Sequence, residues 1–446
     1  MKLKTILAGA MALGITSSAM AQTTEITITG ATAFRQATMQ AIYDAYTSVG
    51  ALGNSFNVCH DFTGNNLSQL IASNKAVFSG TFPGITGTTV IRTAFNGSTE
   101  GLNAIAGNNN PTFLQTAALL NTGSIQGSTT TPTQTLRPKF SFSDVYQSTS
   151  PVDNEVLNPV GASAVGVVTF TMIANEGAPA DLTNVTIQQA RQLWTSGIQP
   201  LSLFTGDPTD TTWVLATGRN DGSGTRAAYL TEWTYGVANL VNQYVATATG
   251  TSGNQITALT LVPANGIGSG NFSTGRTSDA STLWGNTATG NGGYSSSSAL
   301  RTLMGLTSSS VDIYNGVDNA PDVEDSPVFL ITWLSTADAR NAVTAGGKLL
   351  SYNGVGVTPI AASGSYLNSG FNEADFKKIA NGVYSAWSYQ HMYYHGSLSG
   401  NENIWYTAMK NTYLPVGLAT TSNGLELGDM AVTRPDDGFP IVAPLN

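Results

Sequence analysis

Three strand-like segments of this chain each run into a junction of glycine and hydroxyl residues that opens a helix. The junctions lie at 30–32, 97–99 and 222–225. This alternation predicts an α/β fold with largely parallel sheets. In such sheets ligands gather at the carboxyl ends of the strands, where these junctions lie. The three junctions are therefore the first place to expect a binding site.

The junction at 218–226 carries the most chemical information. It follows a strand-like segment at 212–217 and precedes a segment, 226–245, whose apolar residues recur at the spacing of one helix face. Ser223, Gly224 and Thr225 should therefore lie at a helix start, where unpaired N–H groups and the helix dipole favour an anion. Arg219 adds a planar, bidentate donor. The run predicts half of a site for a tetrahedral oxyanion.

Periodicity and composition predict the other elements. Strands are expected at 25–29, 89–95, 328–333 and 387–394. Helices are expected at 32–48, through Leu102 and Ile105, at 336–344 and at 403–410. The range 182–194 is expected to be a strand end or turn followed by a helix with Thr186 as its N-cap. The polar stretches 107–135 and 246–298 are expected to be surface insertions with little secondary structure.

The first 21 residues have the pattern of a secretory signal. Lys2 and Lys4 precede an apolar stretch, and a small-x-small cleavage site ends at Ala21 with no lipoprotein cysteine after it. We therefore expect a periplasmic or secreted protein without a membrane insertion. Without the two lysines the chain has 16 basic and 27 acidic residues, a net charge of −11. Such a charge argues against nucleic acid and anionic membranes as partners.

Three further groups of residues suggest a function, but each also has a simpler structural interpretation. Cys59 has His60 and Asp61 as neighbours, but a buried, inert thiol is expected rather than a nucleophile. His391 and His395 have zinc-helix spacing, but they fall in a strand-like segment. The acidic residues of 312–325 miss the calcium-loop pattern and suit a solvated loop. Metal binding at either place is left open, and neither a metal nor a cofactor is expected.

Taken in order, the junctions resemble those of the periplasmic phosphate-binding proteins of phosphate ABC transporters, in the type 2 periplasmic-binding-protein superfamily. Segment 219–225 is similar to the family signature Arg-x-Asp-Gly-Ser-Gly-Thr. Weaker likenesses lie, in family order, at 28–34, 97–101, 140–144, 182–197, 329–335 and 381–387. This chain departs from the family in placing Thr32 one position early, in carrying Glu100 at the anion turn and in being about a hundred residues longer.

The resemblance implies a fold of two lobes, each a mostly parallel sheet flanked by helices, with long polar surface insertions. After the signal peptide expected at 1–21, it implies lobe I at 22–155 plus 380–446 and lobe II at 156–379. The chain would cross between the lobes near 150–165 and 375–390, and the lobes would close on the ligand by a hinge motion. A monomer is expected.

The resemblance also implies a set of ligand contacts. The residues are Thr32, the Phe34 amide, Ser98, Asp144, Arg219, Ser223, Gly224 and Thr225, with Asp221 orienting Arg219 from behind. Asp144 implies the ligand, because a carboxylate beside an anion is repulsive unless the anion donates a proton to it. Phosphate and arsenate carry such a proton at neutral pH and sulfate does not.

The function implied is capture of inorganic phosphate for uptake through an ABC permease, without catalysis. The alternative is a secreted surface or matrix protein that retains the fold, with phosphate binding lost or incidental. Serine hydrolysis fits poorly, because Gly222-Ser223-Gly224 lacks the full Gly-x-Ser-x-Gly elbow and the chain has three histidines. A phosphatase would need metal ligands that the sequence does not assemble.

Overall fold

A computed structural model describes residues 23–120, 122–128, 130, 132–152, 156–248, 255–262, 292–314 and 322–443. The predicted signal at 1–21 lies outside these residues. The strands are β1 (Thr23–Gly30), β2 (Phe56–His60), β3 (Lys75–Gly80), β4 (Thr88–Phe95), β5 (Thr112–Leu114), β6 (Gln126–Gly127), β7 (Thr133–Thr135), β8 (Phe140–Ser143), β9 (Ala164–Ala174), β10 (Asn184–Val185), β11 (Ile198–Pro200), β12 (Trp213–Ala216), β13 (Tyr244–Ala248), β14 (Ile256–Leu261), β15 (Val311–Tyr314), β16 (Val323–Ser326), β17 (Val328–Ser335), β18 (Lys348–Tyr352) and β19 (Trp387–Tyr394).

The described helices include eleven α-helices and several short helical turns. The α-helices are α1 (Arg35–Thr47), α2 (Leu67–Ala72), α3 (Ser98–Ile105), α4 (Ile187–Ser196), α5 (Ser202–Thr205), α6 (Gly224–Glu232), α7 (Ser297–Met304), α8 (Thr336–Thr344), α9 (Glu373–Ala380), α10 (Gly400–Ala408) and α11 (Leu414–Thr421). The turns are η1 (Thr116–Ala118), η2 (Gln147–Thr149), η3 (Tyr366–Asn368), η4 (Met409–Tyr413) and η5 (Leu427–Asp429). No described helix is both long and apolar enough to cross a membrane.

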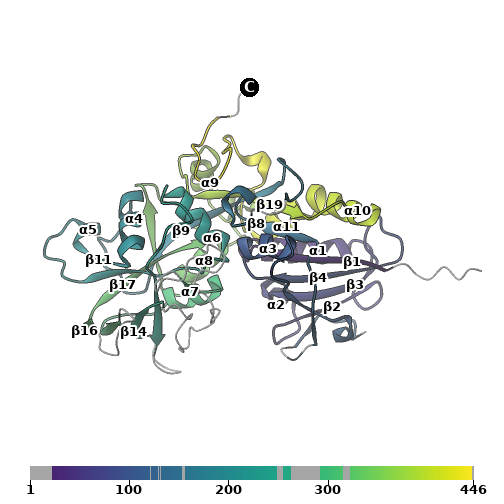
Figure 1. Cartoon of the computed structure of the whole chain (residues 1–446), viewed down its shortest axis with the longest axis horizontal. Coiled ribbons are helices and arrows are strands. Elements are labelled where there is room, and N and C mark those ends of the chain that lie inside the picture. Colours follow the sequence, from purple (N-terminus) through teal and green to yellow (C-terminus); the bar gives the residue numbers. More distant parts are fainter. Residues whose placement is uncertain are drawn as a thin grey trace, which may run out of the picture.

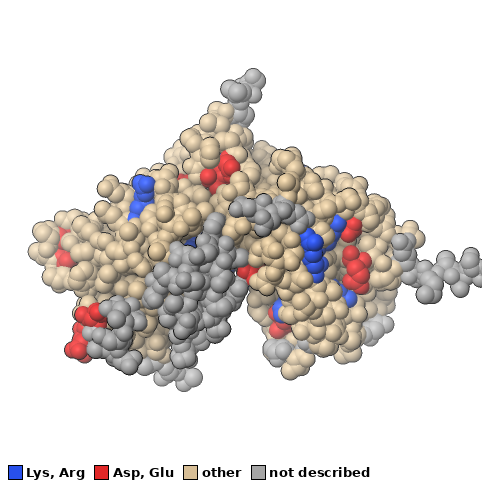
Figure 2. All heavy atoms as spheres, viewed as in Figure 1, with Lys and Arg blue, Asp and Glu red and all other residues tan. Residues whose placement is uncertain are grey.

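One large sheet organises the described chain. Its strand order is β11-β12-β17-β9-β19-β8-β1-β4-β3-β2-β6, with β18 pairing to β9 and β10 to β18. We call the strands from β8 to β6 the first half of the sheet and those from β11 to β17 the second half. Figure 1 shows the two halves on opposite sides of the molecule, with β9 and β19 between them. Charged side chains are few on the face shown in Figure 2, as expected for a chain with 10% charged residues.

The two halves are joined by a strand that belongs to both. The first part of β9 pairs with β19, as in Thr169↔Trp387, and its last part pairs with β17, as in Phe170↔Ser335. Both pairings are antiparallel, and ten of the eleven residues of β9 are buried. Parallel pairs lie within each half, β4-β1-β8 in the first and β12-β17 in the second. The predicted α/β fold class is confirmed, with antiparallel pairs at the middle of the sheet and in the pairs β11–β12, β2–β3 and β3–β4.

The carboxyl ends of the parallel strands lead into the segments that the sequence singles out. Strand β1 ends at Gly30 before α1, and β4 ends at Phe95 before the Gly97 turn and α3. In the second half, β12 leads to the 218–226 run and α6, and β17 leads directly into α8. Several predicted elements are confirmed closely, among them the strand at 387–394, the helix at 336–344 and the N-cap at Thr186, which forms a capping box with Gln189.

The helix predicted over 226–245 is wrong in its length. Helix α6 ends at Glu232, because Trp233 forms its C-cap and Thr234 and Gly236 take positive φ values of 53° and 91°. The apolar residues that continue the helical spacing serve other elements: Val241 is buried in a loop and Tyr244 begins β13. The spacing of apolar side chains does not reveal this break, because the backbone turns while buried residues continue at helical intervals.

The expectation of little secondary structure over 246–298 is also wrong for its described part. The end of β13, all of β14 and the start of α7 lie in it, and β13 and β14 join the later strands β15 and β16 in a separate sheet. Together with α7 and α8 these strands pack on the second half of the main sheet through a common apolar core that includes Ile256, Leu300 and Leu330. The segments 249–254 and 263–291 lie outside the described residues. The described residues of 107–135 contain only short elements, as expected.

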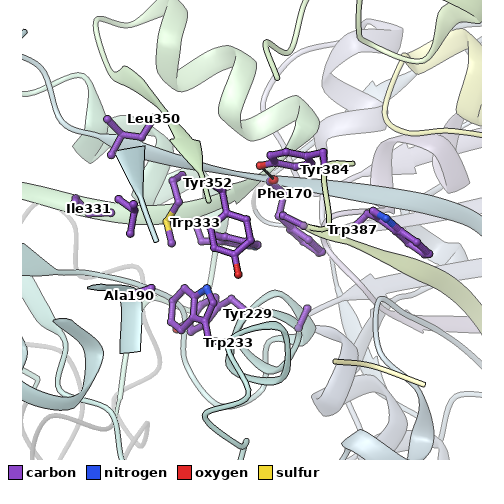
Figure 3. Close-up of a cluster of buried hydrophobic side chains, with 14 of the residues drawn as sticks. Phe170, Ala190, Tyr229, Trp233, Ile331, Trp333, Leu350, Tyr352, Tyr384 and Trp387 are labelled. Carbon is purple, nitrogen blue, oxygen red and sulfur yellow. Dashed lines mark hydrogen bonds between the residues drawn. The ribbon is translucent and has the colours of Figure 1, made fainter. Parts of the chain in front are cut away.

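An aromatic cluster supports the second half of the sheet, as Figure 3 shows. Trp333 of β17 is 1% exposed, and its ring lies edge-on to Trp233 at 5.8 Å and to Tyr352 at 5.2 Å. Tyr229 and Trp233 of the α6 end stack at 4.6 Å. Tyr384 donates a hydrogen bond to the Phe170 carbonyl at 2.6 Å, which ties this cluster to β9. The rings therefore connect α6 to the strands that join the halves.

We predict that Trp333→Ala lowers the free energy of unfolding by about 3–5 kcal/mol, because it removes a large ring from a packed core. Urea unfolding followed by circular dichroism would measure the loss. Leu203→Ala in α5 is the matched control, since Leu203 is 51% exposed and its truncation should change stability by less than about 0.5 kcal/mol. Equal stability of the two variants would contradict the role given to the cluster.

Candidate functional site

Two of the predicted junctions, one from each half of the sheet, touch each other directly. The Glu100 amide donates to the Gly222 carbonyl at 3.1 Å, and the Thr99 hydroxyl donates to the Asp221 carbonyl at 2.7 Å. Gly97 has φ +132°, and a Cβ there would lie 2.2 Å from the Gly222 oxygen. Only glycine allows this approach, because any side chain would both strain the backbone and overlap the opposite turn. The starts of α3 and α6 are thereby held together.

Asp144 lies at the meeting point of these turns. It follows β8 directly and is 1% exposed. Its amide donates to the Ser98 hydroxyl at 3.2 Å, and its Oδ2 accepts from the Thr225 hydroxyl at 3.3 Å. Its Oδ1 is buried and accepts no hydrogen bond from any residue that the structure describes. A buried carboxylate oxygen in this state is costly unless a donor reaches it.

The first turns of α3 and α6 supply amides around Asp144. Gly224 packs so closely that a Cβ would lie 2.3 Å from Ser98 Oγ and 2.4 Å from Asp144 Oδ1. Among the described residues, no acceptor is hydrogen-bonded to the amides of Ser98, Thr99, Gly224 or Thr225. The Ser223 side chain caps α6 by accepting from the Arg226 amide at 3.4 Å. These buried helix starts are suited to an oxyanion, which can accept from all of them.

Arg219 is 1% exposed and is held by more protein contacts than the sequence suggests. Its Nε donates to the Tyr294 carbonyl at 2.9 Å and its Nη2 to the Ser295 carbonyl at 2.9 Å. Its Nη1 donates to the hydroxyls of Ser297 at 2.7 Å and Thr32 at 3.3 Å. Four of its five N–H groups are therefore used, and one remains for a ligand. The bidentate contact expected from the sequence is not available in this arrangement.

The remaining predicted residues take the following places. Thr32 reaches the site through its bond to Arg219, whereas the Phe34 amide donates to the Ala31 carbonyl at 3.3 Å. Helix α1 begins at Arg35 rather than near Thr32. Asp221 is predicted to orient Arg219. The groups bonded to Arg219 come instead from 294–297 and Thr32, while the Asp221 carbonyl faces Thr99.

Sequence reasoning missed the segment that holds Arg219. Residues 294–297 lie at the edge of a stretch expected to be a surface insertion, yet they form hydrogen bonds with the 218–226 run. The Tyr294 amide donates to the Gly218 carbonyl and the Asn220 amide to the Tyr294 carbonyl, at 2.9 and 3.1 Å. A local signal exists in the serines at 296–298 before an apolar helix pattern. Asn220, also overlooked, is fully buried, and neither its Oδ1 nor its Nδ2 is hydrogen-bonded to a described residue.

Burial governs the electrostatics of this cluster. Desolvation raises the pKa of Asp144 from 3.8 to about 6, against the opposing effects of its backbone amide, the Arg219 charge and the Thr225 hydroxyl. Desolvation lowers the pKa of Arg219 to about 10, while Asp144 acts to raise it. At neutral pH Asp144 is thus ionised, but the groups around it only partly offset the cost of burying its charge. Such a group favours a ligand that brings its own proton.

The other residues singled out in the sequence lie away from this cluster. Cys59 is buried, as predicted, and forms no disulfide. His391 lies in β19, where its Nδ1 is 2.8 Å from the Ser163 hydroxyl, and its burial lowers its pKa to about 3. Asp318 of the acidic run lies outside the described residues. Within the described ranges, no group of three or more His, Cys, Asp or Glu side chains is placed to hold a metal ion.

Comparisons with known proteins give only distant similarities. No family model matches the chain, and no curated protein matches it. Among solved structures, it is similar to a candidate phosphate ABC transporter substrate-binding protein from Clostridium perfringens with bound phosphate, at 11% identity and a TM-score of 0.42 over 90% of this chain and 99% of that chain. It is also similar to an ABC-type phosphate transport receptor from Vibrio cholerae, at 9% identity and a TM-score of 0.41 over 90% and 99% of the two chains. Because these identities and TM-scores are low, conclusions about the function of this chain rest on its own residues.

The raised pKa of Asp144 predicts a pH dependence of stability in phosphate-free buffer. Between pH 4 and 6 the folded state binds more protons than the unfolded state, so the free energy of unfolding falls as pH rises. A shift from 3.8 to about 6 corresponds to about 3 kcal/mol. Urea unfolding at pH 4 and pH 7 should show that this decrease in the free energy of unfolding is absent from Asp144→Asn. Asp437, whose pKa is raised to about 7, acts equally in both proteins. Parallel pH profiles would contradict the prediction.

Gly224→Ala should disrupt the contact between the helix starts, because its methyl group would overlap Ser98 Oγ and Asp144 Oδ1. We expect at least a tenfold loss of anion affinity by calorimetry, with the far-UV circular dichroism unchanged. Gly400→Ala is the matched control: Gly400 is also the first residue of a helix, and a Cβ there meets nothing within 4 Å. An affinity loss shared by both variants would count against a local effect at Gly224.

Proposed function

We propose that this chain is an exported binding protein that captures inorganic phosphate, or arsenate, and delivers it to an ABC permease. The observation that carries the proposal is the environment of Asp144. Its Oδ1 is buried without a donor among the described residues, beside the unbonded first-turn amides of two helices. Hydrogen phosphate would satisfy both sets of groups at once, since its oxygens accept from the amides and its hydroxyl donates to the carboxylate.

Selectivity for phosphate over sulfate follows from the same carboxylate. Sulfate carries no proton at neutral pH, so it would leave Oδ1 facing a second negative oxygen in a buried site. A buried acceptor without its donor costs about 1–3 kcal/mol, and more when it is charged. Arsenate shares the tetrahedral shape and the proton of phosphate. We therefore place arsenate with phosphate as a ligand.

The two-lobed organisation is part of this proposal. In it, lobe I comprises 22–155 and 380–446, lobe II comprises 156–379, and β9 and β19 form the crossing between them. Ser98 and Asp144 come from the first half of the sheet, and Arg219 and Thr225 from the second. A hinge at the crossing strands would open the site to admit the anion and close it again. No step of this function requires catalysis.

Calorimetric titration of the purified protein with phosphate and with sulfate tests the proposal. We expect saturable phosphate binding at least roughly 100-fold tighter than sulfate binding, because sulfate lacks the proton that Asp144 requires. Asp144→Asn should narrow this ratio at least tenfold, since the amide also offers donors. Asp207→Asn, at an exposed turn, should leave the ratio unchanged.

Absence of saturable binding by either phosphate or arsenate would overturn the proposed function. The alternative of a secreted surface or matrix protein would then have to be pursued through self-assembly measurements.

A further inference from the structure

Arg35 is a second buried arginine close to the candidate site, and its guanidinium is far less occupied than that of Arg219. It is the first residue of α1, three positions after Thr32, and is 9% exposed. Among the described residues it makes one hydrogen bond, from Nη1 to Asn74 Oδ1 at 2.5 Å, and its buried Nε has no acceptor. A buried guanidinium with most of its donors unused is costly unless an anion meets it.

Helix α7 from the second half of the sheet leads from Arg219 toward the same place. Ser297 accepts from Arg219, and Arg301 lies four residues further along, on the same face of α7. Arg301 Nη1 is 3.4 Å from Asp338 Oδ1 in the first turn of α8. One face of α7 therefore leads from the Arg219–Ser297 contact to Arg301.

The start of α1, which carries Arg35, lies beside the start of α7, because Thr32 and Ser297 both accept hydrogen bonds from Arg219 Nη1. Burial lowers the pKa of Arg35, and the nearby charges of Asp338 and Arg301 act on it in opposite directions, with Asp338 the larger of the two. The Arg219 charge is also close enough to interact with that of Arg35. Asp338 is already engaged by Arg301 and by the Ser335 hydroxyl, at 3.4 Å each. The Asp61 charge acts on Arg35 in the same direction as that of Asp338, but Asn74 is the one hydrogen-bond partner of the Arg35 side chain among the described residues.

We propose that Arg35 and Arg301 form a second anion subsite beside the first, so that the cleft accepts ligands with two linked anionic groups, of which inorganic diphosphate is the simplest. This inference rests on the proposed function, because the first group would occupy the phosphate site. The Arg301 side chain is 32% exposed, so the subsite lies toward solvent, where a longer ligand can extend. Arg35 can offer an anion two parallel N–H donors, whereas most N–H groups of Arg219 are bonded to protein acceptors.

Calorimetry with orthophosphate and with diphosphate tests the subsite. We expect the wild-type protein to bind diphosphate at least about tenfold tighter than orthophosphate. Arg35→Met should lower diphosphate affinity roughly 10- to 100-fold, the usual range for losing a charged hydrogen bond in a buried site. Orthophosphate affinity should stay within about threefold, and it reports at the same time that the variant is folded.

Arg191→Met is the matched control, since Arg191 is exposed on α4 and its side chain bonds only to the Thr234 carbonyl among the described residues. It should leave both affinities unchanged. Orthophosphate binding without tighter diphosphate binding overturns the subsite and leaves the proposed function intact. Equal loss of both ligands in Arg35→Met also overturns it, because Arg35 would then serve the first site or the fold. Failure of the wild type to bind either ligand overturns the proposed function and this inference with it.

Discussion

The close approach of two glycine-containing turns is the constraint on which the rest of the site depends. Gly97 packs against the Gly222 carbonyl, and Gly224 packs against Ser98 and Asp144, at distances that leave no room for a Cβ. Because these turns begin α3 and α6, their contact brings two helix starts from different halves of the sheet together. The result is a buried set of amide donors facing one carboxylate. That arrangement is expensive by itself and becomes favourable when an oxyanion joins it.

Two arginines near this contact differ in how many of their N–H groups remain available to a ligand. Arg219 is the arginine of the signature run, yet the 294–297 segment and Thr32 take four of its N–H groups. It therefore ties the second half of the sheet to Thr32 of the first half and retains one donor. Arg35 has no comparable protein partners and keeps its charge in a buried position. Sequence motifs record which residue types are present, whereas the hydrogen bonds decide which of them remain available to a ligand.

The elements predicted well from the sequence are those with strong local signals. Helix α8 and strand β19 have the predicted bounds, and α4 begins at the predicted Thr186 cap, because burial periodicity and capping act within a few residues. The helix after the signature run fails beyond Glu232, since the turn at Thr234 and Gly236 interrupts the backbone without interrupting the apolar spacing. Strand β14 and helix α7 were overlooked because polar composition dominates their surroundings, although packing against the main sheet stabilises both.

The sequence by itself determined the α/β class, the three junctions and the helix start in the 218–226 run. These follow from periodicity, glycine and hydroxyl placement, and the general chemistry of helix starts, all of which are local. Only the tertiary structure decided that Ser98, Asp144 and Thr225 meet, that Tyr294, Ser295 and Ser297 hold Arg219, and that Arg35 stays largely unbonded. Those contacts join residues from 46 to 81 positions apart, and no local pattern specifies the strand pairing that brings them together.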